Sequence, residues 1–339
     1  ASLSARQISD LCRDVLSEAA ETSVGVATER DEVADCRQAL REFQAICHDN
    51  LEERGTWDEM LAESTVLDSL QTLDQAVAGL KPVIVALEGS SRGMDGCLQR
   101  LAEIQAQFDH LDKPPSDAEV RWFERRGRGF AIHTTPLDIS SLFSGFCEQA
   151  DAAWVFTSAT LSVGGDFGHF VRSLGLQDAD TLKLDSPFDY PNNSLLWLPE
   201  DLPEPRDVTF VPDLLQQVRP VLEASRGRAF MLFTSHRALQ RAAELLDGDI
   251  NHPLFVQGQM PRSTLLESFR KSGDGILLGT ASFWGGVDVM GEALSLVIID
   301  KLPFAPPNDP VMDARSKQLR QHGGNPFMEL FLPQAVITL

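Results

Sequence analysis

Short apolar segments alternate with amphipathic segments through the second half of this 339-residue sequence, and this alternation constrains the fold more than any other feature. The apolar segments have strand length, whereas the segments between them carry apolar residues at helical spacing. Because strands separated by helices pair in parallel and are covered on both faces, the pattern predicts a doubly wound α/β sheet. The expected strands are 153–157, 194–198, 229–234, 254–257, 275–279 and 294–300, and the expected helices include 213–224, 237–246 and 264–271.

The first 119 residues have a different pattern, which predicts an all-helical domain. Ser4 with Gln7 and Thr56 with Glu59 have the spacing of a capping box, in which paired side chains satisfy the free amides at a helix start. The segment Lys113-Pro-Pro-Ser116 ends the helical pattern. Four helices are expected, with these inward-facing stripes: Ile8, Leu11, Cys12 and Val15; Val33, Cys36, Leu40, Phe43 and Cys47; Leu67, Leu70 and Val77; Leu98, Leu101, Ile104 and Phe108.

A β-hairpin is expected between these two regions. Residues 120–124 and 129–134 have the composition of paired strands, and the turn between them contains glycine. A short helix over 142–146 follows. The sequence therefore predicts three parts: a helical domain over 1–119, a connecting segment over 120–165, and a sheet domain over 166–339.

The formal net charge of −21 argues against a protein that coats nucleic acid by bulk electrostatics, because neutralising phosphates requires clustered Lys and Arg. One local basic segment stands out, in which Arg121, Arg125, Arg126 and Arg128 flank Trp122 and Phe123. Arginines can grip phosphates while aromatic rings stack on bases. A solvated hairpin turn remains the alternative interpretation.

The cysteines and the apolar runs favour a cytoplasmic protein. The five cysteines form no C-x-x-C pair and have no nearby histidine cluster, which favours neither a zinc site nor an iron–sulfur cluster in this sequence. No apolar run approaches the roughly 20 residues that span a bilayer, and the first residues lack the pattern of a secretory signal.

Hydroxyl-bearing and glycine-rich segments follow four of the expected strands. In a doubly wound sheet these positions face ligands beyond the carboxyl ends of the strands. A single segment of this kind would carry little weight, since Ser and Thr also cap helices. The four segments are Thr157-Ser-Ala-Thr160, Phe233-Thr-Ser-His236, Gln257-Gly-Gln-Met-Pro-Arg-Ser263 and Gly279-Thr-Ala-Ser-Phe-Trp-Gly-Gly-Val-Asp288.

Together these segments resemble the later motifs of superfamily 2 helicases, specifically the XPD-like group of the bacterial DinG/YoaA type. Thr157 to Thr160 is similar to motif III, Phe233 to Ser235 to motif IV, and Gly279 to Asp288 to motif V. The tail segments Asp300-Lys-Leu-Pro-Phe304, Asn325-Pro-Phe327 and Leu332-Pro-Gln334 are also similar to this group. The resemblance at the level of motifs covers about 131–339, and the helical region matches by position the Arch domain inserted before motif III. It implies a RecA-like second motor lobe preceded by an Arch-like domain.

The resemblance also implies roles for individual residues. Gly286 and Asp288 would face ATP, with Asp288 accepting a hydrogen bond from the ribose or from a water, although a turn capped by aspartate is the alternative. Ser235, Thr280 and the backbone of His236 would contact phosphates of single-stranded DNA. Trp284 would stack on a base or pack in the core. Ser158 and Thr160 would couple the two lobes, with helix capping as their alternative.

Several family features have no counterpart in this sequence. There is no G-x-x-x-x-G-K-[ST] loop to hold ATP phosphates, and Asp31-Glu-Val-Ala, within a helical stripe, is not a DEAH box. The resemblance places the cysteines of the iron–sulfur cluster upstream of Ala1 and the arginine finger beyond Leu339. We therefore expect a piece of a longer protein, with no catalytic residue of its own and inactive alone, whose intact form uses ATP and Mg²⁺.

The functional hypothesis is an ATP-dependent 5′ to 3′ DNA helicase in repair or replication, acting as a monomer on single-stranded DNA. The acidic helical region could then bind replication or repair proteins. The alternative is a protein- or DNA-binding module without ATPase activity. A stand-alone α/β hydrolase or nucleotide-sugar enzyme is disfavoured, because the sequence lacks a Ser–His–Asp pattern, a metal cluster and a dinucleotide glycine fingerprint.

Overall fold

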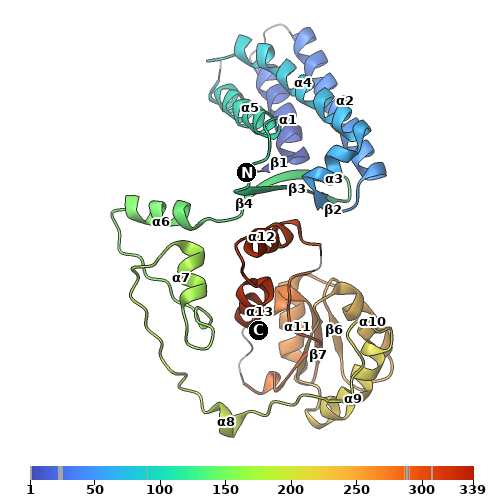
Figure 1. The fold of residues 1–339 in the computed structure, drawn as a ribbon. Helices are drawn as coiled ribbons and strands as arrows, with labels where there is room; N and C mark the ends of the chain where they lie inside the picture. The colour runs from blue at the N-terminus through green and yellow to red at the C-terminus, as the bar shows by residue number, and fades with distance from the viewer. Residues whose placement is uncertain are drawn as a thin grey trace. The chain divides into compact units, whose positions relative to one another are not determined.

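The computed structural model describes residues 2–21, 26–89, 91–285, 287, 289, 291–306 and 308–339; of residues 21 and 26–30 it describes the backbone alone. The chain divides into two compact units. The helical unit comprises Ala1–Val155, Val171–Gln177 and Ala305–Pro326, and the parallel-sheet unit comprises Phe156–Phe170, Asp178–Phe304 and Phe327–Leu339. Figure 1 shows the elements of each unit.

Four long helices pack around one core in the helical unit: α1 (Ala5–Glu21), α2 (Val26–Asn50), α4 (Ser64–Ala86) and α5 (Arg92–Leu111). The residues of the four expected stripes are buried in this core, with two exceptions. Leu67 and Leu98 are both half-buried, and Leu98 packs against the core. Below the helices in Figure 1 lies an antiparallel sheet in the order β1-β4-β3-β2. Its strands are β1 (Ser2–Ser4), β2 (Arg54–Thr56), β3 (Glu119–Arg126) and β4 (Gly129–Pro136).

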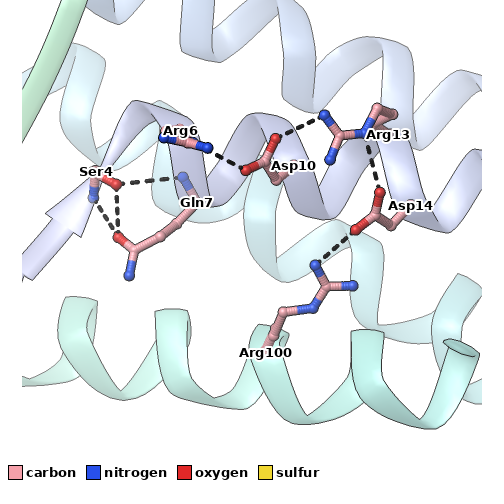
Figure 2. Close-up of polar contacts among 7 residues, drawn as sticks. All are labelled: Ser4, Arg6, Gln7, Asp10, Arg13, Asp14 and Arg100. Carbon is pink, nitrogen blue, oxygen red and sulfur yellow. Dashed lines mark hydrogen bonds and ion pairs between the residues drawn. The ribbon is translucent and has the colours of Figure 1, made fainter. Parts of the chain in front are cut away.

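Both predicted capping boxes are present. The Ser4 hydroxyl accepts from the Gln7 amide at 3.3 Å while the Gln7 side chain accepts from the Ser4 amide at 2.8 Å (Figure 2). Thr56 and Glu59 make the same exchange at the start of α3 (Trp57–Ala62). The expected third helix is interrupted at Glu63, which is extended, so α3 and α4 are separate helices.

Charged, partly exposed side chains connect α1 to α5. Arg100 of α5 donates to Asp14 of α1 at 2.8 Å, and Arg13 and Asp10 extend this network along α1 (Figure 2). The Arg100 guanidinium, followed by that of Arg13, lowers the pKa of the Asp14 carboxyl below its ordinary value. The charge network therefore favours one register of α1 against α5.

The predicted hairpin is confirmed, and it shares the core of the helical unit. β3 and β4 pair from Glu119 opposite Pro136 to Arg126 opposite Gly129. Phe123 and Phe130 point into the helical core. Helix α12 (Pro310–Gln321) contacts β3, and Arg54 in β2 forms an ion pair of 2.8 Å with Asp309, which caps α12. The helical unit thus also contains sheet, including the short strands β1 and β2, which apolar spacing did not predict.

The parallel-sheet unit confirms the doubly wound prediction. Its strands β5 (Ala229–Leu232), β6 (Leu254–Val256), β7 (Ile276–Gly279) and β8 (Leu296–Ile299) pair in parallel in the order β6-β7-β5-β8. α9 (Phe210–Ala224) and α10 (His236–Leu246) pack with Met231 on one face, whereas α11 (Arg262–Ser272) packs with Phe230 on the other. Alternate residues of β5 thus enter two different cores.

Two strand predictions are wrong. Residues 153–157 and 194–198 form no strand in the structure, although both segments are apolar. Val155 is 83% exposed and Leu195 is 93% exposed. A strand requires a neighbour that takes up its backbone hydrogen bonds, and within the described residues neither segment has one.

The remaining elements are short or lie at the ends of larger ones. They are α6 (Ser140–Gln149), where 142–146 was predicted, α7 (Gly168–Leu174), α8 (Tyr190–Asn193), α13 (Leu332–Thr338), a π-helical turn over Phe327–Phe331, and 3₁₀ turns over Ala281–Phe283 and Gly291–Ala293. Among the described helices, none is both long and apolar enough to cross a membrane.

Candidate nucleic-acid and nucleotide interface

The carboxyl ends of β5 and β7 bring two of the predicted DNA-contacting hydroxyls to one edge of the sheet. Ser235 follows β5 and caps α10, accepting a hydrogen bond from the Ala238 amide at 3.2 Å. Thr280 follows β7, which is hydrogen-bonded to β5. The Phe233 amide also donates to the Gly279 carbonyl at 2.8 Å, so the pairing continues to the beginning of both loops.

Gln257 holds Thr280 in place. Its side-chain oxygen accepts from both the amide (2.7 Å) and the hydroxyl (3.1 Å) of Thr280, which is buried. Gln257 comes directly after β6, so this contact connects the ends of two neighbouring strands. Because the hydroxyl donates to Gln257, it has lone pairs but no further proton to offer a phosphate. A DNA contact by Thr280 would require exchange of that bond.

A buried carboxylate holds the loop after β5. Asp300 follows β8, its side chain is 1% exposed, and its Oδ1 accepts from the Thr234 amide at 3.0 Å. Burial raises the pKa of Asp300 above its ordinary value, although Lys301, with Nζ 3.8 Å from Oδ2, opposes the shift. The Asp300 contact fixes the backbone immediately before Ser235 and His236.

The loop after β7 is braced by Arg262. The Arg262 guanidinium donates to the Gly285 carbonyl at 3.2 Å and lies 5.4 Å from the centre of the Phe283 ring. Phe283 is buried, and Trp284 is half-buried against the same core. Trp284 therefore packs at least in part, which is the alternative considered for it. Gly286 and Asp288, the two predicted ATP contacts, lie outside the described residues.

The basic segment of the hairpin is divided between core and surface. The Arg121 side chain is 1% exposed and donates to the carbonyls of Leu111 and Lys113. Arg125 donates to the carbonyls of Leu51 and Glu52. Only Arg126 and Arg128 are exposed. We therefore keep those two as candidate DNA contacts and omit Arg121 and Arg125, whose donors are in use.

Ser158 and Thr160, predicted to couple two lobes, lie in an exposed turn. Their hydroxyls are 3.3 Å apart, and the Thr160 amide donates to the Ser158 hydroxyl at 3.2 Å. Both side chains are accessible to a partner, and their coupling role stays a prediction. Gln257 and Arg262 belong to a segment that the sequence predicts to face ligands, but neither was predicted to have a role of its own, and no role was predicted for Asp300. Asp300 also directly follows a strand, which is the sequence signal that could have identified it.

The last third of the chain matches a known helicase domain. Residues 218–339 match the family model described as a helicase C-terminal domain. The whole chain is 37% identical to "ATP-dependent DNA helicase YoaA" of Haemophilus influenzae over 348 residues and 36% identical to the protein of that name from Escherichia coli over 342 residues. It covers 53% of each, so the chain spans about half the length of these curated relatives.

A solved structure titled "XPD_Helicase" has the same fold. Its TM-score is 0.54 at 13% identity, with 99% of this chain and 57% of that chain covered. At this identity the likeness concerns the fold alone. The likeness spans nearly the whole chain.

Proposed function

Because the chain belongs to the DinG/YoaA group of XPD-like helicases, we propose that it supplies an Arch-like helical part and the second RecA-like lobe of an ATP-dependent DNA helicase. The observation that carries this proposal is the convergence of Ser235, Gln257 and Thr280 at the carboxyl edge of a parallel sheet in such a chain. The proposed domain boundaries remain 1–119, 120–165 and 166–339.

The sheet edge is suited to binding a single strand of DNA. The amides of His236 and Arg237 lie in the first turn of α10, where no preceding helical carbonyl can accept from them. Ser235 accepts from the Ala238 amide instead, so these two amides present the positive end of the helix dipole. A backbone phosphate can accept from such amides. We propose that this helix start and the Ser235 hydroxyl hold one phosphate, with Trp284 contributing one ring face to a base.

ATP would bind at the segment of the sequence that contains Gly286 and Asp288. A glycine permits close approach of the backbone to a ligand, and a carboxylate can accept from a ribose hydroxyl or orient a water. In motors of this type, phosphoryl transfer depends on groups positioned from two lobes, so nucleotide binding and hydrolysis change how the lobes meet. The bound strand would be moved by that change, in the 5′ to 3′ direction that the family resemblance implies. Ser158 and Thr160 would couple the movement of one lobe to that of the other.

Metal and cluster chemistry is assigned to no residue of this chain. Among the described residues, no three His, Cys, Asp or Glu side chains could hold a metal ion together. Cys12, Cys36, Cys47 and Cys97 are buried in the helical core and Cys147 is partly exposed. We propose that the whole protein uses Mg²⁺ with ATP, and that an iron–sulfur cluster would take its ligands from other segments of that protein. No step proposed above passes through either group.

The cellular context is also part of the proposal. We propose a cytoplasmic, monomeric enzyme of DNA repair or replication, with the acidic helical unit available to partner proteins. The alternative, a binding module without ATPase activity, predicts that partners are retained in a pull-down with no dependence on DNA or nucleotide.

The proposed function is tested in the full-length protein by measuring ATP hydrolysis with and without oligothymidylate, and unwinding of duplexes with a 5′ or a 3′ overhang. Stimulation by DNA and a preference for the 5′ overhang are expected. Asp288→Ala should abolish most of the stimulated rate, whereas Asp249→Ala, which removes an exposed carboxylate from the same unit, should not. An Asp288→Ala protein with the unmodified stimulated rate would refute the nucleotide assignment.

A further inference from the structure

A basic pocket lies beside Ser235 in the parallel-sheet unit. It has a volume of about 550 Å³ and lies between residues 205–211 and the first turns of α10. Four of its lining side chains are cationic and two are acidic, in a chain whose net charge is −21. The cations are Arg206, Arg237, Arg241 and Lys301, and the acids are Asp207 and Glu244.

The cations of this pocket are poorly neutralised by the protein. Arg206 and Arg237 are exposed, and within the described part of the chain their side chains make no ion pair or hydrogen bond. Arg241 is 3.3 Å from Glu244, but both side chains are largely exposed, so water weakens that pair. Lys301 is 3.8 Å from the buried Asp300. Like charges gathered in this way repel one another unless an anion lies between them.

The pocket includes the start of α10, where several contacts hold the backbone. Ser235 caps the helix, Asp300 fixes the preceding amide, and Leu239 of α10 is fully buried. Arg237 is the second residue of the helix, so its guanidinium and the free amides at the helix start are presented by the same turn. A phosphate held there would meet the helix dipole and a planar, two-pronged donor together.

We propose that this pocket binds phosphodiester groups of single-stranded DNA, with Arg206 and Arg237 as the main contacts and Arg241 and Lys301 beside them. The inference rests on the proposed function and extends it, because it adds four cationic side chains to which the family resemblance gave no role. The pocket adjoins Ser235, so a strand held at the sheet edge would pass directly into it. This explains how a strongly acidic protein can hold a polyanion: the positive charge is concentrated in one place.

The same chemistry would suit the phosphates of a free nucleotide, so the experiment must separate the two ligands. The main variant is Arg206→Gln/Arg237→Gln in the full-length protein. The matched control is Arg219→Gln/Lys271→Gln, which removes the same charge from the same unit at two ion pairs outside the pocket, one partly exposed and one exposed. Binding of fluorescent oligothymidylate is measured by anisotropy over a range of salt concentrations, and the KM for ATP is measured separately.

The expected loss of DNA affinity follows from counterion release. A contact to single-stranded DNA releases about 0.7 of a counterion, so each lost contact weakens binding about five-fold near 0.1 M salt. The double variant should bind about 25-fold more weakly than the unmodified protein, and the slope of log K against log salt should flatten by about 1.4. Arg206→Gln/Arg237→Lys should bind DNA more tightly than Arg206→Gln/Arg237→Gln but more weakly than Arg206→Gln alone, because lysine keeps the charge of arginine and lacks its forked geometry.

Three results have distinct meanings. If the double variant and the control bind DNA equally well, the pocket is not a DNA site. If the double variant raises the KM for ATP while its DNA affinity and salt slope are unchanged, the pocket serves a nucleotide instead and the proposal is overturned. A protein that binds DNA through these arginines but shows no DNA-stimulated ATP hydrolysis would support the pocket and refute the proposed motor function.

Discussion

Replacing Arg121 by alanine separates two hypotheses for the basic segment of the hairpin. As a DNA contact, this arginine would add affinity and little stability. In the structure its guanidinium is buried, donating to the carbonyl of Leu111 at 3.0 Å, to that of Lys113 at 2.7 Å, and to Glu119 at 3.0 Å. It therefore connects the end of α5 to β3.

The stability cost can be estimated from these contacts. A hydrogen bond to a charged group is worth about 1.5–3 kcal/mol, and removing one partner of a buried charge pair costs about 3–5 kcal/mol because the other charge is left unpaired. Glu119 is mostly buried and would keep only its contact with His110 at 3.0 Å. Arg121→Ala should thus lower the free energy of unfolding of the helical unit by about 3–5 kcal/mol.

The assay is urea denaturation of the full-length protein, followed by pulsed hydrogen exchange of the peptides of α5 and β3, so that the midpoint reports on the helical unit. With a slope of about 2 kcal/mol per molar urea, the midpoint of that unit should fall by about 1.5–2.5 M. Arg126→Ala is the control, because its side chain is 86% exposed and should change stability by less than about 0.5 kcal/mol. An Arg121→Ala protein with an unchanged midpoint but weaker DNA binding would contradict the buried placement.

Three further predictions concern local stability and pH. Thr56→Ala should destabilise α3 by about 0.5–2 kcal/mol and be visible in the fluorescence of the adjacent buried Trp57. Burial raises the pKa of Asp300, so the folded protein holds the proton of this carboxyl group more tightly than the unfolded chain does, and stability falls as pH rises above about 4. Asp300→Asn should therefore raise Tm near pH 7 and have a smaller effect near pH 4. Arg100 lowers the pKa of Asp14, so this carboxylate stabilises the fold above about pH 4 and the benefit is lost as pH falls. Asp14→Asn should lower the free energy of unfolding at pH 7, but not near pH 2, by less than about 1 kcal/mol because both groups are partly exposed. A Tm difference independent of pH would contradict either assignment.

Features encoded by neighbouring residues were predictable from the sequence. The capping boxes at Ser4 and Thr56 depend on side chains three residues apart, and both formed. The four strands of the parallel sheet were also predicted, because a strand covered on both faces is nearly all apolar. The order of the hydroxyl-bearing segments placed Ser235 and Thr280 at one edge of the sheet, as observed.

Features that depend on distant partners were not predictable in this way. The apolar segment at 153–157 has the composition of a strand, but composition does not reveal whether a neighbouring strand exists to pair with it. The basic pocket likewise combines Arg206, Arg237 and Lys301, which no local pattern connects.

The error over Arg121 has a local cause. In a strand, alternate side chains share a face, so Arg121 must lie on the same side as Phe123. Phe123 is buried in the helical core, and the guanidinium is carried into the interior with it. The composition of a basic and aromatic segment does not show which of its arginines remain in solvent. Only the alternation of side chains along the strand carries that information.

The central claim is that single-stranded DNA lies along the carboxyl edge of the parallel sheet, and cross-linking tests it most directly. The full-length protein would be bound to oligothymidylate containing a photoreactive base, irradiated, and the cross-linked peptides identified by mass spectrometry. Cross-links within 234–241 and 280–285, lost on competition with unlabelled strand, are predicted. Cross-links confined to the helical unit, with none in those two segments, would contradict the account.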